Sequence, residues 1–69
     1  MKQIMERNSD GTIFRKYYVN NRGQKHGLFI NYLYNHNLMY KSNWKNDELY
    51  GLETWYYINS EIEEQKYYL

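Results

Sequence analysis

Few side chains in this 69-residue sequence are of the types that perform catalysis or bind metals. The two histidines, His26 and His36, have no cysteine to join them, so a zinc site would need further ligands for which the sequence has no local signature. Glu61, Glu63 and Glu64 could supply an acid and a base. On a strand, however, Glu61 and Glu63 share one face and Glu64 lies on the other. We therefore expect these carboxylates to mark a sheet edge, where charge opposes aggregation.

Motifs for nucleophilic catalysis and phosphate binding are also missing. Ser9 and Ser60 lie in predicted turns, and neither they nor Ser42 form part of a nucleophile elbow. The 4 glycines make up neither a dinucleotide-binding fingerprint nor a P-loop. The sequence therefore predicts a protein with no catalytic residue, no metal site and no cofactor. His26 is expected to have a structural role in a turn, next to Gly27.

Aromatic residues are the best candidates for a binding site. The 10 Tyr, 2 Trp and 2 Phe make up 20% of the chain, and Tyr and Trp are enriched at interface hot spots. A single sheet without a covering helix cannot bury all of these rings. We predict a partner surface drawn from Tyr32, Tyr34, Tyr40, Trp44, Trp55, Tyr56, Tyr57 and Tyr68.

Two other interpretations of the rings remain open. Strong curvature could close one face of the sheet on itself and leave rings such as Tyr17 in a cross-strand ladder on the other face. The rings could also stack on nucleic-acid bases beside the basic residues Arg15, Lys16, Arg22 and Lys25. A net charge of only +1 makes nucleic acid the weakest of the three.

A repeat of about 24 residues positions these rings. When Gly27 is aligned with Gly51, the matched pairs include Leu28 with Leu52, Tyr32 with Tyr56, Asn35 with Asn59, Leu38 with Ile62 and Trp44 with Tyr68. Alternating apolar residues between Asn, Asp and Gly turns predict strands at 2–6, 12–19, 28–34, 38–45, 52–58 and 61–68. The predicted fold is all-β: one curved antiparallel meander of five or six strands in a single domain, with hairpin repeats at about 8–27, 28–51 and 52–69.

Composition indicates the source and the compartment. The chain has no Ala and no Pro but much Asn, Lys, Ile and Tyr, which is typical of an AT-rich genome and hence of a low-GC bacterium or a phage. Residues 1–6 lack the apolar stretch of a secretory signal, and no run approaches the roughly 20 apolar residues of a membrane span. We therefore expect a cytoplasmic protein without a transmembrane segment.

Charge is unevenly distributed along the chain. The first 35 residues carry a net charge of +4, and the remainder carries −3. Because a meander places its strands in sequence order, one edge of the sheet should be basic and the other acidic. Such a surface could simply be solvated, or it could support head-to-tail self-association or docking of a bipolar partner.

Residues 40–51 resemble the MORN-repeat family. The segment Tyr40-Lys-Ser-Asn-Trp44-Lys-Asn-Asp-Glu-Leu-Tyr-Gly51 is similar to the family pattern Tyr-x-Gly-x-Trp-x-Asn-Gly-x-x-His-Gly, and Gly23-x-x-His26-Gly27 matches its closing half. The likeness covers roughly residues 8–69 and is greatest to the bacterial variant of the repeat, commonly described as an antitoxin component. The chain departs from the family at Ser42, Asp47, Tyr50 and His36, where the family has Gly or His.

This resemblance implies a curved meander that binds proteins, with membrane-lipid binding claimed for some members and no catalytic residues. Together with the rings, it predicts a small non-enzymatic module that docks on a partner protein and neutralises or regulates it, as an antitoxin does. Two alternatives are a phage-encoded inhibitor of a bacterial defence enzyme, of the anti-CRISPR or anti-restriction type, and a structural homo-oligomer. The homo-oligomer would join through the edge that contains Tyr67, Tyr68 and Leu69.

Overall fold

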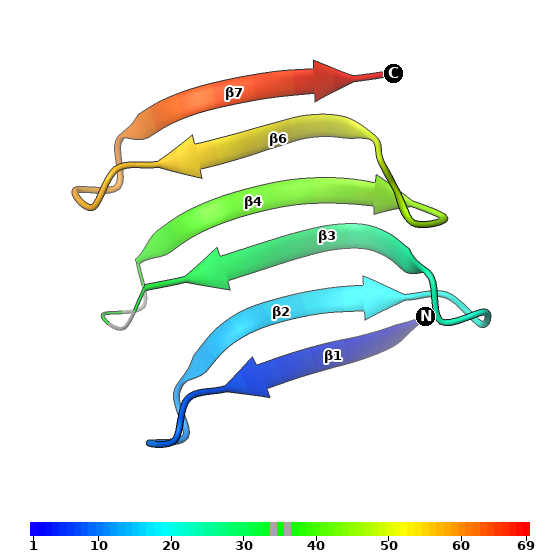
Figure 1. The fold of residues 1–69 in the computed structure, drawn as a ribbon, viewed down its shortest axis with the longest axis horizontal. Coiled ribbons are helices and arrows are strands. Elements are labelled where there is room, and N and C mark those ends of the chain that lie inside the picture. Colours follow the sequence, from blue (N-terminus) through cyan, green and yellow to red (C-terminus); the bar gives the residue numbers. More distant parts are fainter. Residues whose placement is uncertain (34, 36) are drawn as a thin grey trace.

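The computed structural model describes residues 1–33, 35 and 37–69, and these form one antiparallel sheet (Figure 1). The strands are β1 (Lys2–Arg7), β2 (Ile13–Val19), β3 (Lys25–Tyr32), β4 (Leu38–Lys45), β5 (Glu48–Leu49), β6 (Gly51–Tyr56) and β7 (Ile62–Tyr68). Their order in the sheet is β1-β2-β3-β4-β6-β7, and the short β5 pairs with β4. The predicted all-β meander is therefore confirmed, and β1 and β7 are its two edges.

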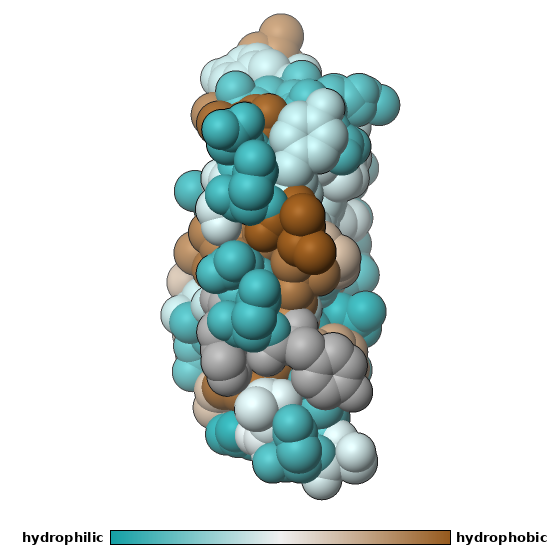
Figure 2. Space-filling view, turned by 90° about the vertical axis from the view of Figure 1, so that its left-hand side faces the viewer, coloured by the Kyte–Doolittle hydropathy of each residue, from teal (hydrophilic) through white to brown (hydrophobic). Residues whose placement is uncertain are grey.

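The sheet is a single layer. Its Cα atoms extend 33 × 29 × 11 Å, whereas a second packed sheet would add about 10 Å to the shortest dimension. Figure 2 shows the same thinness from the side, with polar and apolar side chains on both faces. Among the described residues, no element covers either face. Side chains can therefore be buried only by neighbours on the same sheet.

Strand bounds differ from the prediction mainly at β3. β4 begins and ends where the sequence predicts, but β3 begins at Lys25 because that residue pairs with Val19 of β2. The polar pair Lys25 and His26 was predicted to lie in a loop and a turn, but both residues belong to this strand. Two-residue β5 was not predicted; it forms because Leu49 pairs with Trp44.

Three hairpin turns repeat the same hydrogen bond, in which an Asx side chain accepts from the backbone N–H two residues later. Asp10 Oδ1 accepts from Thr12 at 3.0 Å, and the Oδ1 atoms of Asn35 and Asn59 accept from Asn37 and Glu61 at 3.1 Å. Short polar side chains favour such turns because they satisfy backbone donors locally. The spacing of the three turns matches the period seen in the sequence.

Glycine is the last residue of each of the first two repeat units. Gly27 and Gly51 have φ values of 100° and 79°, a region that other residues rarely adopt. Both follow the loops on the side of the sheet opposite the three hairpin turns (Figure 1). These two loops are bonded to each other, since Asn20 Nδ2 donates to Asn46 Oδ1 at 3.0 Å. Asp47 also bonds to the start of β3: Lys25 N donates to Asp47 Oδ1 at 2.7 Å, and Asp47 N donates to Lys25 O at 2.9 Å. Hydrogen bonds between loops thus reinforce the stacking of hairpins.

Strand register divides the side chains between two faces. One cross-strand row consists of Glu6, Arg15, Asn31, Tyr40, Trp55 and Glu64. The adjacent row, on the other face, consists of Met5, Lys16, Ile30, Lys41, Thr54 and Gln65. The described residues that are buried, Ile30, Ser42, Glu53 and Thr54, all lie on the inner strands β3, β4 and β6. The centre of the sheet is therefore its core, and it is shared between both faces.

Candidate functional site

A connected group of rings lies on one face of the sheet, and we call it the aromatic face: Tyr17, Phe29, Tyr40, Trp44 and Trp55. Tyr17 stacks on Phe29 with 5.3 Å between ring centroids, and Phe29 lies 6.0 Å from Tyr40 and 6.3 Å from Trp44. Tyr40 continues the row to Trp55 at 5.6 Å. These separations are favourable for aromatic pairs. Every ring in the group is half-buried, so each keeps surface that a partner can contact.

Three cations lie over these rings. Lys25 Nζ is 4.9 Å from the centroid of Trp44, and Lys66 Nζ is 5.5 Å from that of Trp55. The guanidinium carbon of Arg15 lies 5.9 Å from the centroid of Phe29. Each position is within the range of a cation–π interaction. The aromatic face therefore presents positive charge as well as apolar surface.

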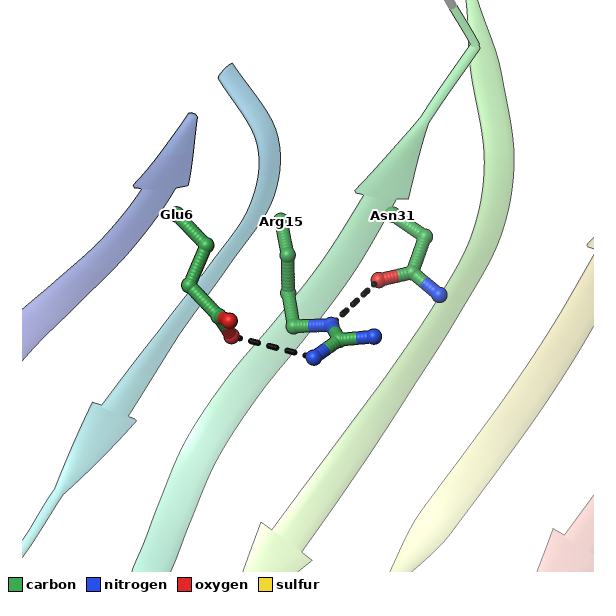
Figure 3. Close-up of polar contacts among 3 residues, drawn as sticks. All are labelled: Glu6, Arg15 and Asn31. Atoms are coloured by element: carbon green, nitrogen blue, oxygen red, sulfur yellow. Dashed lines mark hydrogen bonds and ion pairs between the residues drawn. The ribbon is translucent and has the colours of Figure 1, made fainter. Parts of the chain in front are cut away.

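A polar group fixes the position of Arg15 across three strands (Figure 3). Its Nη1 donates to Glu6 Oε1 at 3.0 Å, and its Nε donates to Asn31 Oδ1 at 3.3 Å. The side chains of Arg15 and Glu6 are both 38% exposed, so this ion pair contributes at most about 1 kcal/mol. Its main effect is to hold the guanidinium between β1 and β3, beside the ring of Phe29.

Glu53 is the buried charged residue of this face, with only 6% of its surface exposed. The hydroxyl of Tyr40 donates to Oε2, and the hydroxyl of Tyr68 donates to Oε1 at 2.7 Å. A buried carboxylate requires such donors because it has lost its hydration. Burial and the hydrogen bond to Glu53 raise the pKa of Tyr40 to about 12, and the same carboxylate raises the pKa of Tyr68. Glu53 thus ties β4 to β7 through the intervening strand β6.

Ser42 supports the largest ring of the face. It is completely buried, and its Oγ accepts a hydrogen bond from Trp44 Nε1 at 2.9 Å. The small side chain leaves room for neighbouring rings, since Ser42 lies opposite Phe29 in the register. The indole of Trp44 is therefore held in one orientation by a bond within its own strand.

The structure brings together half of the eight predicted partner residues. Tyr40, Trp44 and Trp55 belong to the aromatic face, and Tyr68 joins them through Glu53. Tyr32 and Tyr56 follow Asn31 and Trp55 directly, so strand alternation places them on the opposite face. Tyr57 lies beyond the end of β6 and is 50% exposed. Tyr34 lies outside the described residues, as does His36 of the possible metal ligands.

Residues of the aromatic face and its surroundings that were not among the predicted partner residues include Tyr17, Phe29, Ser42, Glu53 and Lys66. Alternation along β3 places Phe29 and Tyr32 on opposite faces, so the sequence did contain a signal that Phe29 belongs with a different set of rings. The hydrogen bonds of Glu53 carried no such signal, because they depend on how β4 and β7 pair with β6. Of the basic residues considered for nucleic acid, Arg15 and Lys25 lie on the aromatic face, Lys16 lies on the opposite face, and Arg22 lies in a loop.

Among the described residues, the fold does not gather the other candidate catalytic and metal-binding side chains into a cluster. Within the described ranges, no three His, Cys, Asp or Glu side chains gather closely enough to hold a metal ion. His26 is half-buried in β3, and its Nδ1 has no hydrogen-bond partner among the described atoms. Glu63 and Glu64 lie on the edge strand β7 and are exposed, and Glu61 precedes it.

Comparison of the chain with protein-family models, with curated proteins and with solved structures found no match. A search of the described residues for a helix long and apolar enough to cross a membrane also found none. The function must therefore be inferred from the geometry of the aromatic face.

Proposed function

We propose that this protein is a small, non-enzymatic binding module whose aromatic face docks on a partner protein. The observation that carries the proposal is that five connected rings are only half-buried and that no described element covers them. Aromatic side chains of this kind dominate the energetics of protein interfaces.

The face is also preorganised for binding. Phe29 is packed against three other rings, Trp44 is bonded to Ser42, and Tyr40 is bonded to Glu53. Side chains held in place before binding lose little conformational entropy on binding. The partner surface would contribute apolar groups to the rings and carboxylates to Lys25 and Lys66, which lie over the rings.

The proposed biological role is neutralisation or regulation of that partner in the cytoplasm, as expected for a bacterial MORN-variant repeat protein of the antitoxin type. A phage-encoded inhibitor of a bacterial defence enzyme would use the same face in another setting. Gene neighbourhood separates the two proposals. A gene beside a toxin gene supports the antitoxin, and a gene among early phage genes supports the inhibitor.

A capture experiment with matched charge variants tests the proposal. Tagged full-length protein is used to recover partners from the source cell, alongside the variants Lys25→Glu and Lys41→Glu. Both substitutions change the net charge equally, but Lys25 lies on the aromatic face and Lys41 on the opposite face. We expect Lys25→Glu to reduce partner recovery at least about tenfold, because it reverses a charge at the interface, and Lys41→Glu to leave it unchanged. Recovery of no protein, together with tight RNA or nucleotide binding, would contradict the proposal.

A second candidate function is that of a structural homo-oligomer. It is favoured by the exposed apolar side chains of the last hairpin, which include Leu52 and Tyr67 on β6 and β7. Protein of monomeric mass at high concentration would remove this candidate.

A further inference from the structure

The final strand, β7, is the least protected element of the sheet. Every residue from Ile62 to Tyr67 is exposed, and only Tyr68 is half-buried. Ile62 and Tyr67 are 54% and 68% exposed, and Leu69 beyond them is fully exposed. β7 pairs with β6 on one side, and no described strand pairs with its other side. An unpaired edge is a template for another strand, and charged side chains on it oppose pairing unless they face opposite charges.

The charges of β7 indicate which strand would fit. Glu64, Gln65 and Lys66 follow one another at the centre of the strand. Neither Glu64 nor Lys66 forms an ion pair within the described chain, and Lys66 Nζ lies over the ring of Trp55. If a second β7 is placed antiparallel and centred on Gln65, Glu64 of each copy lies opposite Lys66 of the other. Opposite charges in directly facing positions stabilise a strand pair.

Head-to-tail pairing of β7 with β1 of a second copy fits less well. The chain contains whole hairpins, so β1 of a second copy would continue the antiparallel order after β7. At the two equivalent junctions within the chain, Arg15 faces Asn31 and Tyr40 faces Trp55. By the same register, Glu64 would face Glu6 of the second copy. Like charges in facing positions destabilise a strand pair.

We propose that two copies of this chain pair through β7, antiparallel and centred on Gln65, to form a closed two-fold dimer. A closed two-fold arrangement is the commonest symmetry of soluble oligomers. Ile30 is the one apolar side chain counted as buried among the described residues, and chains this small often rely on association for stability. Because the two-fold axis is perpendicular to the sheet, both aromatic faces lie on the same side of one continuous sheet. The dimer therefore presents two copies of the proposed binding face to a partner.

Charge exchange on β7 tests the dimer and its register. The mass of the full-length protein is measured by sedimentation or light scattering over a range of concentrations, for wild type, Glu64→Lys, Lys66→Glu and the double variant Glu64→Lys/Lys66→Glu. We expect dimeric wild type, and a dissociation constant raised at least about tenfold in each single variant, because two attractive cross-strand pairs become repulsive. The double variant restores both attractive pairs and should dimerise as wild type does.

Mixing the two single variants provides the control for folding. Glu64→Lys and Lys66→Glu are complementary to each other in the proposed register, so an equimolar mixture should form a heterodimer although each alone is monomeric. Recovery of the dimer on mixing shows that both variants are folded. A monomeric wild type, an assembly larger than two, or tighter association of Glu64→Lys would overturn the proposal; the last two outcomes indicate head-to-tail pairing.

Discussion

The two faces of the sheet are formed by the same strands but bury their side chains in different ways. Phe29 and Ile30 are neighbours in β3 and point to opposite faces. Phe29 contacts Tyr17, Tyr40 and Trp44 on the adjacent strands. On the opposite face, Leu52 remains 46% exposed although Tyr67 lies directly across from it.

This difference follows from side-chain size in a sheet without a covering layer. Strands in a sheet are about 4.8 Å apart, and a ring spans that distance while a short aliphatic side chain does not. On the aromatic face, side chains are therefore partly buried by rings on the neighbouring strands. Buried residues occur at the centre of both faces, at Ile30 and Thr54 on the opposite face and at Ser42 and Glu53 on the aromatic face. Four experiments test whether the aromatic face is the main source of stability.

The largest effect is expected from Phe29→Ala. Phe29 contacts more rings than any other member of the aromatic face, so its removal should lower the free energy of unfolding by about 3 kcal/mol. Urea denaturation followed by circular dichroism measures the change. The matched substitution on the other face is Ile30→Ala. If Ile30→Ala lowers the free energy of unfolding more than Phe29→Ala does, the opposite face is the principal core.

Glu53→Ala should have the next largest effect, a loss of roughly 2 kcal/mol, because the partly buried Tyr40 hydroxyl loses its charged acceptor. Glu48→Ala is the control, since Glu48 is exposed on β5. We expect that change to remain within about 0.5 kcal/mol. Thermal unfolding at one protein concentration compares the two variants. Equal losses would mean that the buried carboxylate does not stabilise the fold.

Alkaline pH should weaken the same interaction. The pKa of Tyr40 is about 12 in the folded protein, against an ordinary value of 10.0, so the unfolded chain releases this proton first as the pH rises. Stability from Tyr40 should be complete below about pH 9 and decline between about pH 10 and pH 12. Denaturation series at several pH values should show that the free energy of unfolding falls less steeply in Tyr40→Phe than in wild type. The fall that remains in the variant is due to Tyr68, whose pKa is also raised. If stability declined as steeply with pH in Tyr40→Phe as in wild type, the loss at alkaline pH would not come from Tyr40.

The smallest effect is expected from Leu52→Thr on the opposite face. Leu52 is 46% exposed, and its backbone carbonyl, which accepts from Asn43 Nδ2, is retained in the variant. The free energy of unfolding should change by no more than about 0.5 kcal/mol. Urea denaturation tests this as well. A loss above about 1.5 kcal/mol, the size of a buried side chain's contribution, would show that this side chain is covered in solution.

The hairpin architecture could be predicted because its determinants are local. Asp10, Asn35 and Asn59 each bond to a backbone N–H two residues away, and Gly27 and Gly51 adopt conformations suited to glycine. Turn chemistry and the alternation of apolar residues are both readable over a few residues. The bounds of β3 and the existence of β5 were less predictable, because pairing with β2 and β4 extends strand structure into polar residues.

The aromatic face was only half predictable. Ring-rich composition indicated that a surface of aromatic residues exists, but Tyr32 and Tyr56 turned out to lie on the face opposite Tyr40 and Trp55. Burial of Glu53 was not predicted, because the sequence does not show which hydroxyl groups will face this carboxylate. Its burial depends on Tyr40 and Tyr68, which come from the strands on either side of β6.

From residue types and spacing alone, the strands, the turns and the repeat follow, because each depends on neighbours a few positions apart. Cross-strand register decides the rest: which rings touch and which carboxylate is buried. Contacts such as those of Tyr17 with Phe29, and of Tyr40 with Trp55 and Glu53, join separate hairpins and exist only once the hairpins have paired.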